Sequence, residues 1–247
     1  QDRNAWHFRC RRCGIVITVH VLQGIILDFD GVIANTEPLH LRAFQETLTE
    51  AGIVLSSEDY YSSYLGFDDA TLFQELVSDR EISMPEDHLS ALIKRKMLKL
   101  QLLLKNESVL FPGAAEFIQH CSSEVPVAIA SGAERHEILE VLAAGGGLQD
   151  QFSAIVATGD TAEGKPFPAP YQLAFTQLRD RTQGNIEARY CVAIEDSHWG
   201  LASARAAGLR CVGVTNTYPA NELPGADLVV SGLDKLTLEI LETLFAN

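Results

Sequence analysis

The stretch of sequence that decides the fold is Gly24-Ile25-Ile26-Leu27-Asp28-Phe29-Asp30-Gly31-Val32. Its apolar first part has the length of a buried strand. Asp28 and Asp30 lie two residues apart, so an extended backbone places both carboxylates on one face. Charges this close require a metal ion or a shared proton, which indicates metal-assisted phosphoryl transfer through an aspartyl phosphate. Alone, Asp-x-Asp-Gly also fits an ordinary turn or half of a calcium loop.

A second apolar run, Val127–Ala130, ends in Ser131 and Gly132, and a helical stretch follows from about Glu134 to Ala143. A hydroxyl and backbone N–H groups at a helix start can hold phosphate oxygens. The alternative is a plain N-cap serine.

Lys165 stands in the segment Gly164–Pro168, before a helical stretch from about Pro170 to Leu178. The prolines restrict the backbone and suit a loop that enters a helix. A lysine held there can neutralise phosphate and carboxylate charge. A solvated loop lysine is the alternative interpretation.

A third apolar run, Tyr190–Ile194, ends in Glu195 and Asp196, and an alanine-rich helix closed by glycine follows over Gly200–Gly208. The two acids also suit a helix N-cap. In an open parallel sheet, ligands bind outside the carboxyl ends of the strands. The carboxylates, the hydroxyl and the lysine are therefore expected to converge on one crevice of an α/β protein.

In this order the residues resemble the haloacid dehalogenase (HAD) superfamily, from about Gly24 to the C-terminus, and within it the β-phosphoglucomutase and sugar-phosphatase branch. The first motif corresponds to Asp28–Glu37, the second to Ser131, the third to Lys165 and the fourth to Glu195-Asp196. The resemblance implies a Rossmann-like parallel sheet with an inserted α-helical cap. It implies a core of residues 24–35 and 109–247 and a cap of residues 36–108.

The resemblance also implies roles for these residues. Asp28 is the expected nucleophile, and Asp30 the general acid and then the base. Mg²⁺ is expected on Asp28, the Asp30 carbonyl and Asp196, with Glu195 bound directly or through water. Ser131, Gly132 and Lys165 are expected to hold the transferring phosphoryl group. These roles agree with the preference of Mg²⁺ for oxygen ligands and with the dependence of phosphoryl transfer on charge neutralisation. A dehalogenase is not expected, since such enzymes lack the second aspartate.

The segment after the first motif has helical spacing, with helices expected over His40–Ala51, from Ser57, over Asp69–Val77 and from Pro85 to Leu104. By the resemblance it is a mobile cap with hinges near Asn35–Thr36 and Leu110–Gly113. His40 then orients Asp30, unless it is a surface histidine. Lys96 contacts substrate, unless Lys94–Lys96 is simply a solvated helix face.

The cap departs from the mutase pattern at one point. Where the mutases carry an arginine that grips a second phosphate, this chain has Leu65-Gly66-Phe67-Asp68-Asp69. An aspartate there repels a second phosphate. A monophosphate phosphatase is therefore favoured over a phosphomutase. A non-catalytic domain that binds phosphorylated metabolites is the third alternative.

The net charge is −14, from 19 lysines and arginines against 33 acids, and no basic stripe is present. We therefore expect a small phosphorylated metabolite as partner, and neither nucleic acid nor an anionic membrane. Five cysteines, with Cys191 and Cys211 in expected core strands, favour a reduced cytoplasmic protein. A monomer is expected, with a weak dimer as the alternative.

Residues 1–23 lie outside the resemblance and include a basic segment. Cys10 and Cys13 have zinc-knuckle spacing, but no second Cys/His pair follows at a suitable distance. Ile15–Leu22 is too short to span a membrane and alternates like an added strand. The role of this extension is left open.

Overall fold

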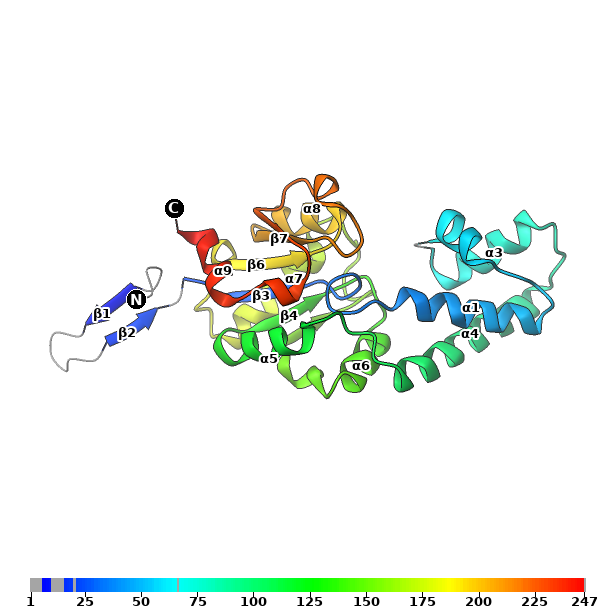
Figure 1. Cartoon of the computed structure of the whole chain (residues 1–247), viewed down its shortest axis with the longest axis horizontal. Coiled ribbons are helices and arrows are strands. Elements are labelled where there is room, and N and C mark those ends of the chain that lie inside the picture. The colour runs from blue at the N-terminus through cyan, green and yellow to red at the C-terminus, as the bar shows by residue number, and fades with distance from the viewer. Residues whose placement is uncertain (1–5, 10–15, 20, 66, 247) are drawn as a thin grey trace. The chain divides into compact units, whose positions relative to one another are not determined.

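The computed structural model of the chain describes residues 6–9, 16–19, 21–65 and 67–246. Its centre is a parallel sheet of six strands in the order β5-β4-β3-β6-β7-β8 (Figure 1). The strands are β3 (Gly24–Leu27), β4 (Val127–Ala130), β5 (Ala154–Val156), β6 (Cys191–Glu195), β7 (Arg210–Val214) and β8 (Leu228–Val230). The expected α/β class with a Rossmann-like parallel sheet is confirmed.

Several small side chains lie on one face of the sheet. Ile26 of β3 is in register with Ala128 of β4 and Ala193 of β6, and these side chains belong to one buried cluster. Helices α7 (Ala169–Arg181) and α8 (His198–Ala206) pack on this face. Small side chains let the helix backbones approach the sheet closely, because a dense interior leaves few voids.

Other helices complete the layers, and Figure 1 shows α5 in front of the sheet with α7 behind it. They are α5 (Ala114–Glu124), α6 (Arg135–Ala144) and α9 (Leu238–Glu242). Short 3₁₀ turns lie at η2 (Leu148–Gln151), η3 (Ala188–Tyr190), η4 (Ala220–Glu222), η5 (Leu233–Lys235) and η6 (Thr243–Phe245).

The chain divides into two compact units, residues 1–35 with 109–247, and residues 36–108. Both connections leave the first unit side by side. Ala34 forms a bridge with Leu110, and the Asn35 N–H donates to the Val109 carbonyl at 2.8 Å. We call the first unit the core and the second the cap.

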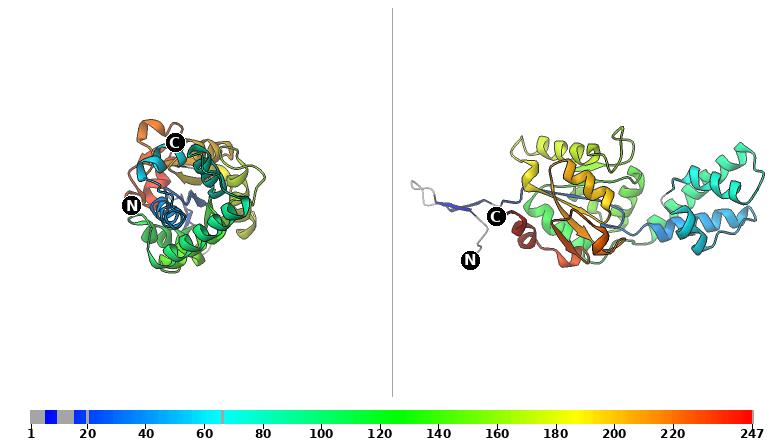
Figure 2. Two further views of the ribbon diagram at one scale, coloured as in Figure 1. Left: turned by 90° about the vertical axis from the view of Figure 1, so that its right-hand side faces the viewer. Right: turned by 90° about the horizontal axis from the view of Figure 1, so that it is seen from above.

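The cap is entirely helical in its described part and can be followed in both views of Figure 2. It contains α1 (Glu37–Glu50), α2 (Ser57–Asp59), the π-turn η1 (Tyr60–Tyr64), α3 (Asp69–Asp79) and α4 (Glu86–Asn106). Phe44, Leu48, Phe73 and Leu92 are among the side chains that form its own buried cluster. Three of the expected helices differ from α1, α3 and α4 only in their ends, by up to a few residues, whereas the helix expected from Ser57 is α-helical only over α2 and continues as the π-helical η1.

The first described residues form a separate antiparallel pair, β1 (Trp6–Arg9) with β2 (Val16–Val19). The strand expected over Ile15–Leu22 is therefore present in part. It pairs with β1 and does not extend the six-stranded sheet. Cys10 and Cys13 lie outside the described residues.

Among the described residues, no helix combines the length and the apolar character that a bilayer crossing requires.

Candidate active site

The candidate site lies where the strand order reverses: after β3 the chain adds strands first on one side of it and later on the other. β3 pairs with β4 on one side and with β6 on the other, so the crevice outside the carboxyl ends of β3 and β6 is the topological switch point. Asp28 follows β3, and Glu195 and Asp196 end β6. The Asp28 N–H donates to the Ile194 carbonyl at 2.9 Å, which holds the two strand ends together.

The chain turns sharply after Asp28. The Phe29 carbonyl accepts hydrogen bonds from the N–H groups of Ile33 and Ala34 at 2.8 and 3.1 Å. Gly31 has φ +75°, and a Cβ there would overlap the Asp196 carboxylate. This glycine is therefore required both by the turn and by the acid beside it. Asp30, partly exposed, lies in the same turn.

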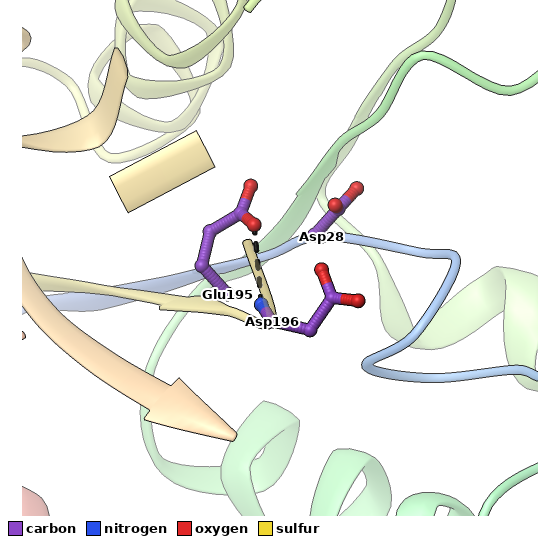
Figure 3. A group of neighbouring side chains, drawn as sticks. All are labelled: Asp28, Glu195 and Asp196. Atoms are coloured by element: carbon purple, nitrogen blue, oxygen red, sulfur yellow. Dashed lines mark hydrogen bonds between the residues drawn. The ribbon is translucent and has the colours of Figure 1, made fainter. Parts of the chain in front are cut away.

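Three buried acids gather at this point, and Figure 3 shows Asp28, Glu195 and Asp196 around the ends of β3 and β6. One carboxylate oxygen from each lies within 4.8 Å of the others. Glu195 is fully buried, and Asp28 and Asp196 are 8% and 6% exposed. Lys165 supplies the neighbouring positive charge: its Nζ is 2.8 Å from Asp28 Oδ1 and 2.6 Å from Glu195 Oε1.

Glu195 is fixed more completely than the other two acids. Besides Lys165, it accepts a hydrogen bond from the Tyr171 hydroxyl at 2.8 Å and from the Ser197 hydroxyl at 3.1 Å. A Cβ at Gly200, in the first turn of α8, would overlap its carboxylate. Glu195 thus orients Lys165 and ties β6 to α7 and α8, in addition to being a possible ligand.

The electrostatics of the site show an excess of negative charge. Burial, and then Glu195, raise the pKa of Asp28 well above its ordinary value although Lys165 opposes this. Burial chiefly raises the pKa of Asp196 to about 6, against a hydrogen bond from Thr217. Burial lowers the pKa of Lys165, but Asp28 and Glu195 outweigh this, and its pKa is raised. The lysine therefore stays charged, and the acids lack one further positive partner.

The donor set fits a divalent cation. When all three acids are ionised, three carboxylates and one ammonium carry a net charge near −2, and all three acids contribute oxygen to one small region. Oxygen ligands of this kind suit Mg²⁺, which keeps several waters and binds few carboxylates. Asp28 and Asp196 are the two acids with the fewest competing partners, and they would hold the ion together with the Asp30 carbonyl.

The remaining expected phosphate ligands also lie in the core. Ser131 follows β4 directly, is buried, and accepts a hydrogen bond from the Ala133 N–H at 3.0 Å. A Cβ added at Gly132 beside it would meet no atom within 4 Å, so the Gly132 backbone borders open space. Lys165 does not follow a strand end directly. It comes after an eight-residue loop, 157–164, that separates β5 from the lysine.

The two candidates in the cap lie together inside its bundle. Lys96 Nζ is 2.5 Å from Asp69 Oδ1, 3.0 Å from His40 Nδ1 and 4.4 Å from the centre of the Phe44 ring. Lys96 is fully buried, so the interpretation of Lys94–Lys96 as a solvated face is wrong for this residue. Burial, and then the charge of Lys96, lower the pKa of His40 to about 3, which keeps the imidazole neutral.

Three residues of the site were absent from the sequence expectations. Tyr171 in α7 holds Glu195, Thr217 holds Asp196, and the Asn216 amide donates to the Gly31 carbonyl at 2.8 Å. Asn216 and Thr217 follow β7 at the same edge of the sheet. The rule that identified the other groups, polar residues after an apolar strand, would have found these two. Nothing in the local sequence marks Tyr171.

The model of the haloacid dehalogenase-like hydrolases matches residues 25–214. This range covers most of the chain, includes all four motifs, and ends with β7. The chain belongs to this family of enzymes.

Several curated relatives align with the chain. Protein CbbY of Rhodobacter capsulatus is 31% identical over 239 residues, 90% of this chain and 99% of the relative. Protein SUPPRESSOR OF QUENCHING 1, chloroplastic, of Arabidopsis thaliana is 30% identical over 79% of this chain, but the aligned region is only 18% of that longer protein. Some relatives have names that state an activity. Fructose-1-phosphate phosphatase YqaB of Escherichia coli is 26% identical over 77% of this chain and 95% of its own length, and β-phosphoglucomutase of Bacillus subtilis is 28% identical over 89% and 94%.

The fold agrees with solved structures. CbbY from Rhodobacter sphaeroides, crystallised with phosphate, superposes with a TM-score of 0.72 at 26% identity, over 87% of this chain and 96% of that chain. A variant of the same protein was crystallised with xylulose-(1,5)bisphosphate at the same TM-score.

Proposed function

We propose that this protein is a magnesium-dependent phosphatase that hydrolyses a small phosphorylated metabolite, a sugar phosphate, through an aspartyl phosphate. One observation carries the proposal: three buried carboxylates and one lysine converge at the switch point of the sheet, and in their ionised form they leave a charge near −2 uncompensated. A divalent cation offsets that charge, and a phosphoryl group can then bind beside the cation and Lys165. Acids that served only as helix caps would not require this excess of negative charge at one point.

In the proposed reaction, Asp28 attacks phosphorus through a carboxylate oxygen and the bond to the leaving alkoxide breaks. Asp30 gives its proton to that alkoxide. It then takes a proton from water, which attacks the aspartyl phosphate and releases inorganic phosphate and free Asp28. Lys165 neutralises charge on the transferring group, and Ser131 with the Gly132 backbone donates hydrogen bonds to its oxygens.

Magnesium held by Asp28, the Asp30 carbonyl and Asp196 would supply charge neutralisation and in-line orientation. Within the chain, Glu195 keeps Lys165 in place through the 2.6 Å contact. Asn216 and Thr217 hold Gly31 and Asp196, which keeps the turn that carries Asp30 against the end of β6. These residues are positioning residues because they act through others.

The substrate class rests on the relatives and on Asp69. Phosphatase and mutase relatives both act on sugar phosphates by their names, and CbbY was crystallised with a sugar bisphosphate. In this chain Asp69 replaces the arginine of the mutase cap and is paired with Lys96 at 2.5 Å. The cap lysine is therefore neutralised and adds little attraction for a second phosphate, which favours a monophosphate.

The experiment is phosphate release from a panel of sugar monophosphates, with xylulose-1,5-bisphosphate included, in magnesium and in EDTA. Release that requires magnesium and is lost in Asp28→Asn supports the proposal. Asp150→Asn makes the same change on an exposed residue of η2 and should keep the wild-type rate. Release that persists in EDTA, or in Asp28→Asn, would contradict it.

A phosphomutase is the second candidate, because β-phosphoglucomutase is among the relatives. It requires a bisphosphate intermediate, which Asp69 disfavours. Transfer between sugar positions without net phosphate release, detected by ³¹P NMR, would favour this candidate over the phosphatase.

The partners and compartment are also proposals. We expect a monomer that meets only small metabolites, in a reducing cytoplasm. Cys121, Cys191 and Cys211 support this, since they are buried thiols, each with its pKa raised to about 12 by burial. Such thiols are inert and pack as small apolar side chains.

A further inference from the structure

A pocket of about 390 Å³ lies at the N-terminal ends of β6 and β7, whereas the catalytic acids lie at the carboxyl ends of the strands. Its lining includes Arg189 and Tyr190 just before β6, Arg205 near the end of α8, and Arg210 at the start of β7. The strand β6 runs from the pocket to Glu195, and its five residues span about 16 Å. The pocket is therefore distinct from the candidate active site and falls in the size range of small-molecule sites.

The pocket carries positive charge on a strongly acidic protein. Three arginines and one acid, Asp227, line it, although the whole chain has a net charge of −14. Asp227 is already engaged, since it accepts from the Cys211 N–H at 2.8 Å and lies 3.5 Å from Arg210. Arg189 and Arg210 are each paired with one acid, Glu187 and Asp227, so the local charge of the pocket is about +1, which still exceeds the partial negative charge of about half a unit at the end of α8.

The contacts described for the three arginines use only some of their N–H donors. Arg205 donates to the Gly225 carbonyl at 2.5 Å, and Arg189 lies 2.8 Å from Glu187. Each guanidinium has five N–H groups in a planar fork, which matches the oxygens of a phosphate. Arg189 and Arg210 are 68% and 46% exposed, so a ligand reaches them without rearrangement.

An apolar wall accompanies the charge. Phe245 ends η6, and its ring is 6.1 Å from that of Tyr190, the residue before β6. Leu209 adds to this wall. The first twenty residues of the chain contain four arginines and one acid, so their charge does not complement the pocket. A small anion with an apolar or ring-bearing part does.

We propose that this pocket is a second ligand site, which binds a small phosphate monoester with its phosphate on Arg189, Arg205 and Arg210 and its apolar part against Tyr190 and Phe245. The site is independent of the catalytic proposal. β6 begins directly after Tyr190 and ends at Glu195, and α8, which carries Arg205, begins two residues after Asp196, so two regular elements connect the pocket to the acids of the fourth motif. The site is thus placed to sense a metabolite other than the substrate.

The test is a ¹H–¹⁵N NMR titration of the full chain with inorganic phosphate and, separately, with AMP. Amides of Gly208 and Arg210 report on the pocket, and those of Gly31 and Gly132 report on the catalytic site. We expect saturable shifts at the pocket amides with a dissociation constant of their own, and tighter binding of AMP than of phosphate.

Two exposed arginines allow variants with little risk to folding. Arg189→Gln and Arg210→Gln should each weaken binding at the pocket about tenfold and leave the catalytic-site shifts unchanged. Arg179→Gln, an exposed arginine of α7, is the charge-matched control and should change neither set. Phe245→Ala should remove the preference for AMP.

The proposal is overturned if high-millimolar phosphate and AMP leave the pocket amides unshifted. It is also overturned if the shifts persist with wild-type affinity in Arg189→Gln and Arg210→Gln. Equal binding of AMP and phosphate would overturn the role of the aromatic wall.

Discussion

Two lysines of this protein lie against acids with little exposure to water, and their surroundings are different: the side chain of Lys96 is fully buried and that of Lys165 is 13% exposed. Lys165 in the core lies between Asp28 and Glu195, with Asp196 close by. Lys96 in the cap lies between one acid, Asp69, and the neutral imidazole of His40. Charge is thus balanced around Lys96 and excessively negative around Lys165.

The comparison teaches that burial of a charged group does not by itself mark a reactive site. A buried lysine with one acid is a satisfied ion pair, as expected inside a packed bundle. The less buried Lys165, among three acids, leaves a demand for further positive charge, which a bound cation that also orients a phosphate can meet. Four experiments probe this difference, from the largest expected effect to the smallest.

Removal of the acid beside each lysine should separate the two sites most strongly. Asp28→Asn should reduce kcat roughly 10⁴-fold or more, because it removes the nucleophile and keeps its volume. Asp69→Asn, the same change beside Lys96, should reduce kcat by less than about tenfold, because it alters no reacting atom. Steady-state phosphate release by both variants measures this, with circular dichroism as the check on folding. Similar losses in the two variants would refute the distinction.

The effect of replacing Asp30 on kcat should depend on the leaving group of the substrate. Asp30→Ala should reduce kcat about 10²- to 10⁴-fold on a sugar phosphate, whose alkoxide needs a proton. The loss should be much smaller on an aryl phosphate, whose leaving group does not. The ratio of kcat values on the two substrates is the measurement, and equal losses would argue against an acid role for Asp30.

Removal of the cap lysine should affect stability more than chemistry. Lys96→Met should cost about 2–3 kcal/mol of unfolding free energy, because Asp69 loses its partner, although a quarter of the Asp69 side chain is exposed to water. Lys94→Met changes an exposed residue of the same helix and should cost less than about 0.5 kcal/mol. Urea unfolding gives both values, and a Lys96→Met/Asp69→Leu double variant should recover part of the loss. No recovery would mean that the pair is not coupled.

The smallest effect is the pH dependence of stability. Unfolded histidine has a pKa near 6.5 and folded His40 one of about 3, so between these values only the unfolded chain binds the proton. Stability should therefore fall as pH falls from 6.5 toward 3. Asp196, with its pKa raised to about 6, contributes to the pH dependence with the opposite sign in metal-free protein. Its contribution to stability falls as pH rises from about 4 to 6.

The two variants His40→Gln and Asp196→Asn test these signs by urea unfolding between pH 4 and 7 in EDTA. His40→Gln should flatten the loss toward acid, and Asp196→Asn should steepen it. His88→Gln, an exposed histidine of α4, is the control and should leave the slope unchanged. An unchanged slope in His40→Gln would show that the imidazole is not held neutral.

Much of the core site could be predicted because its signals are local. Asp28, Ser131 and the Glu195-Asp196 pair each follow a short apolar run, and the parallel sheet brings such positions to one edge. Gly31 was expected as a turn residue, and its second role beside Asp196 emerges only in space. The division at Asn35 coincides with the change from strand to helical spacing in the sequence.

The cap was harder to interpret from the sequence. Lys96 stands in a run of three basic residues, which favours a solvated face. Yet Leu92, Lys96, Leu100 and Leu104 recur every four residues, and all four are buried. Helical spacing therefore indicates that Lys96 is buried, but the charges of Lys94 and Arg95 beside it favoured the interpretation as an exposed face. Tyr171, in turn, is a polar group that only the packing of α7 against β6 brings to Glu195.

The sequence by itself determined the α/β class, the order of the motifs and the acids after β3 and β6, because strand and helix periods and strand-end chemistry are written in neighbouring residues. The tertiary structure decided which charges meet. Whether a buried lysine faces one acid or three, and whether three distant arginines form one pocket, depends on contacts between residues far apart in the chain. Electrostatic energy depends on distances in space and on burial, and neither is a property of a local stretch of sequence.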